Sequence, residues 1–225
     1  MSFSLRRGEI VGITGLLGAG RTELARAIVG AEPPTSGRVI LKGRAVSIRR
    51  PKDALAHGLG LVPEDRKTQG LVLGLSVGRN VALPNTRRLS RWGVVRAGAE
   101  AALAGRWVRD MRVKTPSLAQ PARLLSGGNQ QKVVLGKWLA AEVDVLIVDE
   151  PTRGIDVPAK VEIYDLMNRL TAEGKGILMI SSELPEVLGM SDRVLVMREG
   201  RIAGELEATR TSQAEVLGIA LGHAS

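Results

Sequence analysis

Cysteine is absent from this chain of 225 residues, so neither disulfides nor thiolate metal sites can form. Aromatic residues make up only 2% of the sequence, which leaves almost no side chains on which nucleic-acid bases could stack. No apolar run reaches the roughly 18 residues that a membrane-spanning helix needs, and we expect no signal peptide in the short, polar segment Met1–Arg7. The remaining composition, 44% hydrophobic and 24% charged, is that of an ordinary globular protein.

Acidic residues are outnumbered by basic ones, 23 against 32, and the formal net charge is +9. Such a balance suits nucleic acid, an anionic lipid surface or an acidic partner. The basic residues are spread along the chain, apart from a denser patch at Arg87, Arg88, Arg91 and Arg96. Because the stacking side chains are missing, we predict no nucleic-acid partner.

Apolar segments that read as strands alternate with segments that read as helices. The expected strands are 9–14, 38–43, 59–62, 143–148, 177–180 and 194–197, and the expected helices are 23–29 and 157–170. This alternation predicts an α/β fold with a mostly parallel sheet core. The polar, Arg-rich stretch from about 65 to 125, with a helical run over 97–108, predicts a helical subdomain inserted into a single domain 1–225.

A glycine-rich turn, Gly15–Thr22, follows the first buried strand and opens the first helix. In that context a phosphate loop is expected, because a helix N-terminus and backbone N–H groups freed by glycine bind phosphate oxygens. The Thr22 hydroxyl would be a ligand of Mg²⁺. The predicted nucleotide contacts are Gly15, Gly18, Ala19, Gly20, Arg21, Thr22 and Glu23. The alternative for this turn alone is an ordinary glycine-rich connection between strand and helix.

Two carboxylates, Asp149 and Glu150, follow the aliphatic run 145–148. Ligands of α/β proteins bind at the carboxyl ends of parallel strands, so this pair is placed where a phosphate loop would present its ligand. An exposed acidic strand end is the other interpretation. Upstream, Ser126-Gly127-Gly128 begins a helical segment, which suits an anion-binding helix N-terminus, although a glycine turn that merely caps a helix has the same pattern.

The order and spacing of Gly15–Thr22, Leu125–Lys132 and Asp149–Asp156 resemble the nucleotide-binding domain of ABC transporters. This resemblance implies a P-loop NTPase fold of the ABC ATPase type, with ATP and Mg²⁺ as cofactors. It implies that Asp149 holds Mg²⁺ through water and that Glu150 polarises the attacking water. It also implies that Asp156 lies near nucleotide, and that Ser126, Gly127 and Gly128 bind the γ-phosphate of an ATP held by a partner domain.

Three positions depart from the usual pattern of that family, and all three would face this domain's own γ-phosphate. Arg21 stands in place of Lys, Glu64 in place of a Gln that faces Mg²⁺, and Ser182 in place of a switch His. The planar guanidinium of Arg21 cannot occupy the position between the β- and γ-phosphates in the same way as the compact ammonium of Lys. Ser182 can form hydrogen bonds but cannot supply imidazole chemistry. The resemblance still implies a metal-facing role for Glu64 and a catalytic position for Ser182.

This combination is similar to the second, C-terminal half of the tandem ATPase subunit of monosaccharide importers of the ribose, galactose and xylose type. The resemblance implies an N-terminal ATPase half and transmembrane permease subunits as partners, and a sugar-binding protein as an indirect one. It implies a peripheral position on the cytoplasmic face of the inner membrane. Only 14 residues precede Gly15, so we expect the chain to be a piece of a longer tandem polypeptide with weak ATPase activity alone.

Other classes stay open from the residues alone. A nucleotide-binding regulatory or structural module without turnover would share these motifs. A soluble ABC ATPase that acts on nucleic acid would need long linkers or charged helical insertions, and a small-molecule P-loop kinase would lack Ser126-Gly127-Gly128. The tryptophans, Trp92, Trp107 and Trp138, are interpreted as packing anchors rather than adenine platforms.

Overall fold

The computed structural model describes residues 1–222, and these divide into two compact units. The first unit, here the sheet unit, comprises 1–61, 144–151 and the described chain from 167 onward. The second, the helical unit, comprises Val62–Val143 and Thr152–Leu166, and so contains the predicted insertion together with two further segments. Within the described residues no helix is long and apolar enough to cross a membrane.

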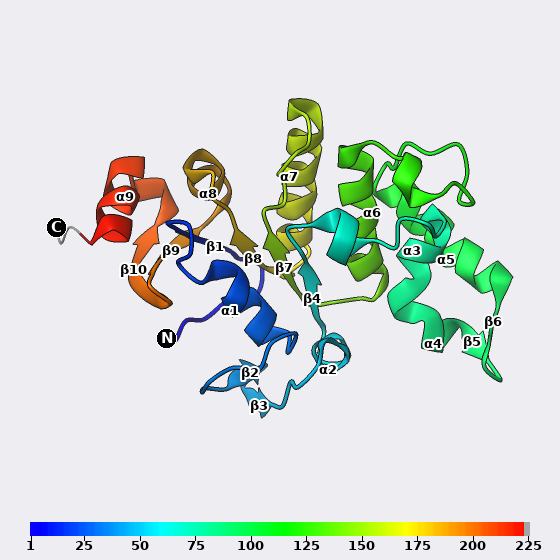
Figure 1. The fold of residues 1–225 in the computed structure, drawn as a ribbon, viewed down its shortest axis with the longest axis horizontal. Coiled ribbons are helices and arrows are strands. Elements are labelled where there is room, and N and C mark those ends of the chain that lie inside the picture. The colour runs from blue at the N-terminus through cyan, green and yellow to red at the C-terminus, as the bar shows by residue number, and fades with distance from the viewer. Residues whose placement is uncertain (223–225) are drawn as a thin grey trace. The chain divides into compact units, whose positions relative to one another are not determined.

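A six-stranded sheet forms the centre of the sheet unit (Figure 1). In spatial order its strands are β10 (Arg201–Glu207), β9 (Arg193–Arg198), β1 (Ile10–Gly15), β8 (Gly176–Ile180), β7 (Val145–Asp149) and β4 (Leu59–Val62). The pairs β9–β1, β1–β8 and β8–β7 are parallel, and β10 pairs with β9 in an antiparallel way. The predicted mostly parallel α/β core is therefore confirmed, and its central strands are mainly aliphatic, as buried parallel strands are.

The helices of the sheet unit close its core. They are α1 (Arg21–Ile28), α2 (Pro51–Ala56), α8 (Leu184–Met190) and α9 (Gln213–Leu221); α7 (Val157–Ala172) belongs to it only in its last residues. A small hairpin joins β2 (Val39–Leu41) to β3 (Arg44–Val46). The main buried cluster of the sheet unit lies between α1 and the central strands. It includes Val11, Ile13, Ala25, Ile147, Leu178, Ile180 and Leu195.

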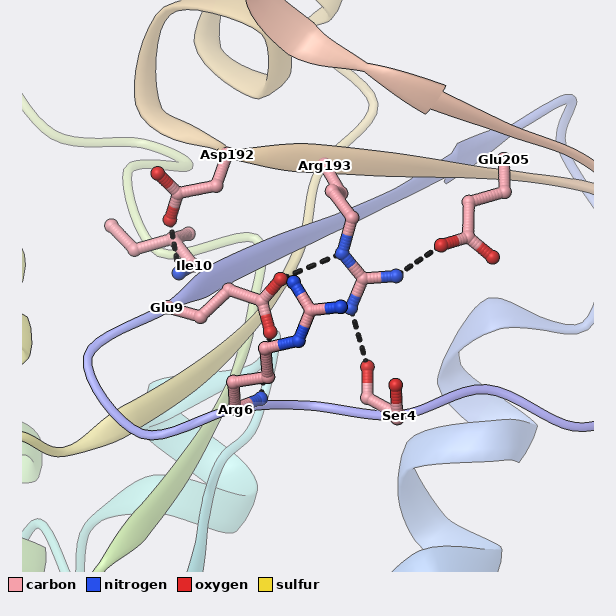
Figure 2. A network of polar contacts seen from close by, with 7 residues as sticks. All are labelled: Ser4, Arg6, Glu9, Ile10, Asp192, Arg193 and Glu205. Carbon is pink, nitrogen blue, oxygen red and sulfur yellow. Dashed lines mark hydrogen bonds and ion pairs between the residues drawn. The ribbon is translucent and has the colours of Figure 1, made fainter.

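A polar network lies at the amino-terminal ends of β1 and β9, whereas the glycine-rich turn lies at the carboxyl end of β1 (Figure 2). Arg193, at the start of β9, donates from Nε to Glu9 across 2.6 Å and forms an ion pair with Glu205. Its second terminal nitrogen donates to the carbonyl of Ser4 across 2.7 Å. Glu9 also accepts from the backbone N–H of Arg6. Since the side chains of Glu9 and Arg193 are largely buried, this network holds the segment around Ser4 and Arg6 against β1, β9 and β10.

The helical unit is built on three packed helices, α3 (Val77–Ala82), α5 (Ala97–Asp110) and α6 (Gly127–Ala140). Its shorter elements are the π-helix Arg66–Gly70, the 3₁₀ turns Leu83–Asn85 and Ala122–Leu124, the helix α4 (Thr86–Leu89), and the hairpin strands β5 (Ser90–Arg91) and β6 (Val94–Val95). Its apolar core includes Val77, Val81, Ala104, Val108, Val133, Val134 and Leu135. Asn80 is buried but satisfied, because its side chain bonds to the backbone of Val72, Leu75 and Ser76.

One tryptophan, Trp92, is not the packing anchor that we expected, because it lies at the tip of the hairpin of β5 and β6. Trp92 is 91% exposed and has a φ of +56°, followed by Gly93 at +80°, so it occupies a two-residue turn and packs into nothing. Several peripheral elements, namely β3, β10, α8, α9 and the hairpin of β5 and β6, are also absent from the expectations above. They lie outside the long aliphatic runs that indicated the central strands.

Candidate functional site

The glycine-rich turn occupies the carboxyl end of β1 and leads directly into α1. Gly20 adopts a left-handed conformation at the N-cap, with a φ of +92°, and Gly18 has a φ of +78° beside open space. A Cβ at Gly15 would lie 2.2 Å from the carbonyl oxygen of Met197, so only glycine fits there. Leu17, at the tip of the turn, is 99% exposed. The loop therefore has the strand–turn–helix geometry that phosphate binding requires.

Asp149 ends β7 beside this turn. The Thr22 hydroxyl donates to Asp149 Oδ2 across 2.8 Å, although the two residues are 127 positions apart. Asp149 is only 2% exposed, and its Oδ1 is buried without a hydrogen-bond partner among the described residues. Burial raises the pKa of this carboxyl group, and the Thr22 hydrogen bond and the Arg21 charge oppose that effect. A buried carboxylate oxygen with no donor is costly unless a ligand completes it.

Glu150 follows at once and is held by the segment after β8. Its Oε1 accepts from the backbone N–H of Ser182 across 2.8 Å, and its backbone has a φ of +49°. Burial raises the pKa of Glu150, while hydrogen bonding from Ser182 and the charge of Arg21 act in the opposite direction. The predicted pair Glu150 and Ser182 is thus brought into direct contact.

Arg21 points across the strand ends. Its Nη1 donates to the carbonyl oxygen of Ser181 across 3.1 Å, and Ser181 in turn hydrogen-bonds to the buried Glu186 of α8. The fork of a guanidinium reaches this carbonyl and spreads its charge toward Asp149 and Glu150. The substitution of Lys by Arg therefore gives a side chain that is anchored in the ligand-free protein.

The donor set is compatible with Mg²⁺. Thr22 supplies a hydroxyl, and Asp149 supplies a buried carboxylate with one oxygen lacking a partner. Mg²⁺ prefers oxygen ligands and takes one or two from the protein while the rest come from water and phosphates. Within residues 1–222 no group of three or more His, Cys, Asp or Glu residues could hold a metal by itself. A metal ion at this edge would therefore need a bound phosphate or water to supply its remaining ligands.

The helical unit carries the second group of predicted residues. Ser126, Gly127 and Gly128, here the signature turn, begin α6 with Ser126 at the N-cap. A Cβ on Gly127 would lie 2.8 Å from Nη2 of Arg66, and one on Gly128 would lie 2.7 Å from the Cβ of Ala159. Packing inside this unit therefore requires a glycine at position 128, whereas a side chain at position 127 would displace the Arg66 guanidinium.

Arg66 joins the signature turn to the loop that follows β7. Its two terminal nitrogens donate to the carbonyl oxygens of Arg153 and Gly154, across 2.8 and 3.1 Å. Burial lowers the pKa of Arg66, and the charge of Asp65 partly offsets this. Glu64 forms an ion pair with Arg153. The residue predicted to face Mg²⁺ is thus engaged within the helical unit by the same loop that Arg66 holds.

The predicted site residues fall into two groups. The sheet unit brings together Gly15, Gly18, Ala19, Gly20, Arg21, Thr22, Glu23, Asp149, Glu150 and Ser182 at one sheet edge. The helical unit holds Glu64, Ser126, Gly127, Gly128 and Asp156. Asp156 accepts from the backbone N–H of Ala159 across 2.8 Å, and so caps the start of α7. Sequence reasoning assigned no role to Arg66 or Arg153, although Arg153 lies within the segment Asp149–Asp156 that carries the resemblance.

Comparison with known proteins agrees with this geometry. A family model described as "ABC transporter" matches residues 1–153. A putative ribose/galactose/methyl galactoside import ATP-binding protein of Burkholderia ambifaria is 55% identical over 221 residues, which cover 98% of this chain and 43% of that protein. A ribose import ATP-binding protein of Rubrobacter xylanophilus is 58% identical over 221 residues, 98% of this chain and 44% of the relative. The chain thus spans less than half the length of these relatives.

Solved structures show the same fold. A nucleotide-free ATP-binding cassette from an ABC transporter has a TM-score of 0.80 at 21% identity, covering 97% of this chain and 87% of the other. A dimeric cassette in a post-hydrolysis state, bound to ADP and Pi, has a TM-score of 0.79 at 20% identity, with coverages of 93% and 89%. The resemblance stated from the motifs is confirmed at the level of family and fold, and the chain belongs to the ABC transporter family.

Proposed function

We propose that this chain is the C-terminal ATP-binding half of the energising subunit of a monosaccharide importer. The observation that carries the proposal is a contrast between two groups of residues. The sheet unit holds a phosphate loop whose Arg21 is bonded to Ser181 and whose own site carries Ser182. The helical unit presents an exposed Ser126 at the start of α6. These features fit a half whose signature turn completes an active nucleotide site on its partner, while its own nucleotide site is the weaker of the two.

At its own site the chain would bind ATP through the backbone N–H groups of the glycine-rich turn and the positive end of α1. Thr22 and the unpaired oxygen of Asp149 would hold Mg²⁺, which supplies charge neutralisation at the β- and γ-phosphates. Glu150, oriented by the N–H of Ser182, would accept a proton from an attacking water. Glu64 is paired with Arg153, which leaves its carboxylate less free to face Mg²⁺.

The proposed partners follow from the same assignment. The signature turn would complete a nucleotide site whose phosphate loop belongs to the N-terminal ATPase half. Transmembrane permease subunits would receive the resulting motion, and a sugar-binding protein would deliver the sugar to them. Within that assembly this chain would be a peripheral component at the cytoplasmic face of the inner membrane. Its positive charge would then serve an anionic surface and not nucleic acid.

The test compares two substitutions in the complete polypeptide assembled with its permease. We expect Ser126→Ala to lower transport-coupled ATPase activity by at least about tenfold, since loss of one donor to a transition-state oxygen can lower kcat by about 10²–10³-fold. Arg21→Ala should have a smaller effect, because Arg21 would act at the weaker of the two sites. Gly128→Asp is less informative, because its Cβ would already collide with Ala159 in this half. Full activity of Ser126→Ala together with inactivity of Arg21→Ala would reverse the proposed roles of the halves.

The isolated chain gives a second test. We expect it to bind Mg·ATP but to hydrolyse it slowly, because a usual Lys, Gln and His are replaced by Arg21, Glu64 and Ser182. Equilibrium binding of a fluorescent ATP analogue and steady-state phosphate release measure the two properties separately. Rapid Mg²⁺-dependent turnover that Glu150→Gln abolishes would contradict the proposal of a weak own site. Binding without turnover in the full assembly as well would favour a regulatory module.

A further inference from the structure

The amide side chain of Asn129 has only one orientation that satisfies its neighbours. The backbone N–H of Lys114 donates to Asn129 Oδ1 across 2.7 Å, and Asn129 Nδ2 donates to Ser126 Oγ across 2.9 Å. A backbone N–H can only donate, so the atom that faces Lys114 must be the amide oxygen. The amide NH₂ therefore faces Ser126, and the flipped alternative would set two donors against each other.

This orientation fixes the role of the Ser126 hydroxyl. Because Asn129 donates to it, Ser126 Oγ is the acceptor in that bond and its own hydrogen is directed elsewhere. No acceptor for that hydrogen is found in the part of the chain that the structure describes. Ser126 is also exposed. The hydroxyl is thus held in place while its hydrogen remains available to an incoming oxygen.

The other serine N-caps of this chain behave differently. Ser76 accepts from the backbone N–H of Arg79 at the start of α3, and Ser212 accepts from that of Glu215 at the start of α9, both across 3.2 Å. This is the ordinary N-cap, in which the serine side chain satisfies a backbone N–H of the first turn. At α6 no such bond forms, and the side chain of Asn129 takes its place. The backbone N–H groups of the first turn of α6 consequently keep no side-chain acceptor.

We propose that Asn129 is a positioning residue that displaces the usual serine cap at the start of α6. Its amide group turns the Ser126 hydroxyl hydrogen, together with the N–H groups of the first turn, toward an anionic oxygen. This inference rests on the proposed function, in which that oxygen belongs to a phosphate of the nucleotide held by the partner half. A helix N-terminus with free N–H groups and an oriented hydroxyl has the donors that such an oxygen requires.

Two substitutions of Asn129 separate orientation from simple packing. Asn129→Asp keeps the acceptor for Lys114 but offers Ser126 a carboxylate, so the Ser126 hydroxyl would donate to it and turn away from phosphate. Asn129→Leu removes both hydrogen bonds at similar size and leaves Ser126 free to rotate. We expect both variants to lower kcat of the complete, permease-bound subunit, by about tenfold or more for Asp and several-fold for Leu, with KM for ATP nearly unchanged.

The decisive measurement is a double-mutant cycle with Ser126→Ala. If Asn129 acts through Ser126, Asn129→Leu should lower kcat in the Ser126 background and change it by less than twofold in the Ser126→Ala background. An equal loss in both backgrounds would overturn the inference. Asn168→Asp, the same change on an exposed position of α7, controls for the added negative charge and should leave kcat unchanged.

The outcomes also separate this inference from the proposed function. If Ser126→Ala alone retains full activity, the proposed function of the signature turn fails. If Ser126→Ala is impaired but the cycle shows no coupling, only the role of Asn129 fails. Thermal unfolding of each variant keeps the result interpretable: a loss of kcat that follows a lowered melting temperature, and does not depend on Ser126, counts against positioning.

Discussion

Arg66 donates to the carbonyl oxygen of Gly154 across 3.1 Å, and Gly154 holds a left-handed backbone with a φ of +66°. The same guanidinium reaches the carbonyl of Arg153, so one side chain fixes two consecutive peptide groups. We predict that Arg66→Met lowers the free energy of unfolding by about 1.5–3 kcal/mol, the range for hydrogen bonds to a charged group. Amide hydrogen exchange over 153–156 should accelerate in the variant.

Arg66→Lys is the matched control for this prediction. Lysine keeps the charge but lacks the planar fork, so it can serve only one of the two carbonyls at a time. Its stability and its exchange rates should fall between those of the native protein and Arg66→Met. Equal behaviour of Lys and Arg would show that charge alone matters at this position, and would contradict the role of the fork.

Asp149→Asn should stabilise the ligand-free chain at neutral pH. Burial raises the pKa of Asp149, so the folded state binds this proton more tightly than the unfolded state, where the pKa is about 3.9. The contribution of the carboxyl group to stability is therefore greatest at low pH and declines as the pH rises through its folded pKa. The gain from Asn should be larger at pH 7 than at pH 3, below the unfolded pKa, as measured by urea unfolding. Asp165→Asn, on an exposed face of α7, controls for net charge.

Glu9→Gln should have the opposite pH dependence. Burial raises the pKa of Glu9, but hydrogen bonds and charges from Arg193 and Arg6 outweigh it and leave the pKa below its usual value. The native ion pair thus stabilises the fold above the unfolded pKa of about 4.3, and this contribution is lost as the pH falls through the folded pKa. We expect Glu9→Gln to lower stability by about 1–3 kcal/mol at pH 7 and by less at pH 3. A deficit that is constant with pH would contradict the assignment to charge.

The central strands and the phosphate loop were predictable because each has a local cause. An aliphatic run such as 145–148 can only be buried, and a glycine-rich turn between strand and helix has few other uses. The carboxyl ends of parallel strands share one edge, which brought Thr22 and Asp149 together although they are 127 positions apart. Hydrophobic periodicity and parallel topology together were enough for this half of the site.

The remaining features depend on contacts that no local pattern encodes. β10 is an edge strand whose residues alternate between exposed and half-buried, so its apolar signal is weak. The bond from Arg66 to Arg153 joins residues 87 positions apart, and an arginine in a loop has many possible partners. The orientation of Asn129 depends on the backbone N–H of Lys114, which has no sequence signature at all. Such side-chain arrangements follow from tertiary packing between residues that are far apart in the sequence.

Trp92→Asn should stabilise the protein although it removes a large apolar side chain. Trp92 is almost fully exposed, so its ring contributes little burial, and its φ of +56° is unfavourable for a bulky residue. Asparagine followed by glycine is the preferred pair for a two-residue hairpin turn with two positive φ angles. We expect a gain of about 0.5–1 kcal/mol in the free energy of unfolding, measured by urea denaturation. Trp92→Ala, which removes the ring but keeps the strain, should gain nothing. A loss of stability in Trp92→Asn would mean that the ring packs in the folded protein and that the turn is not strained.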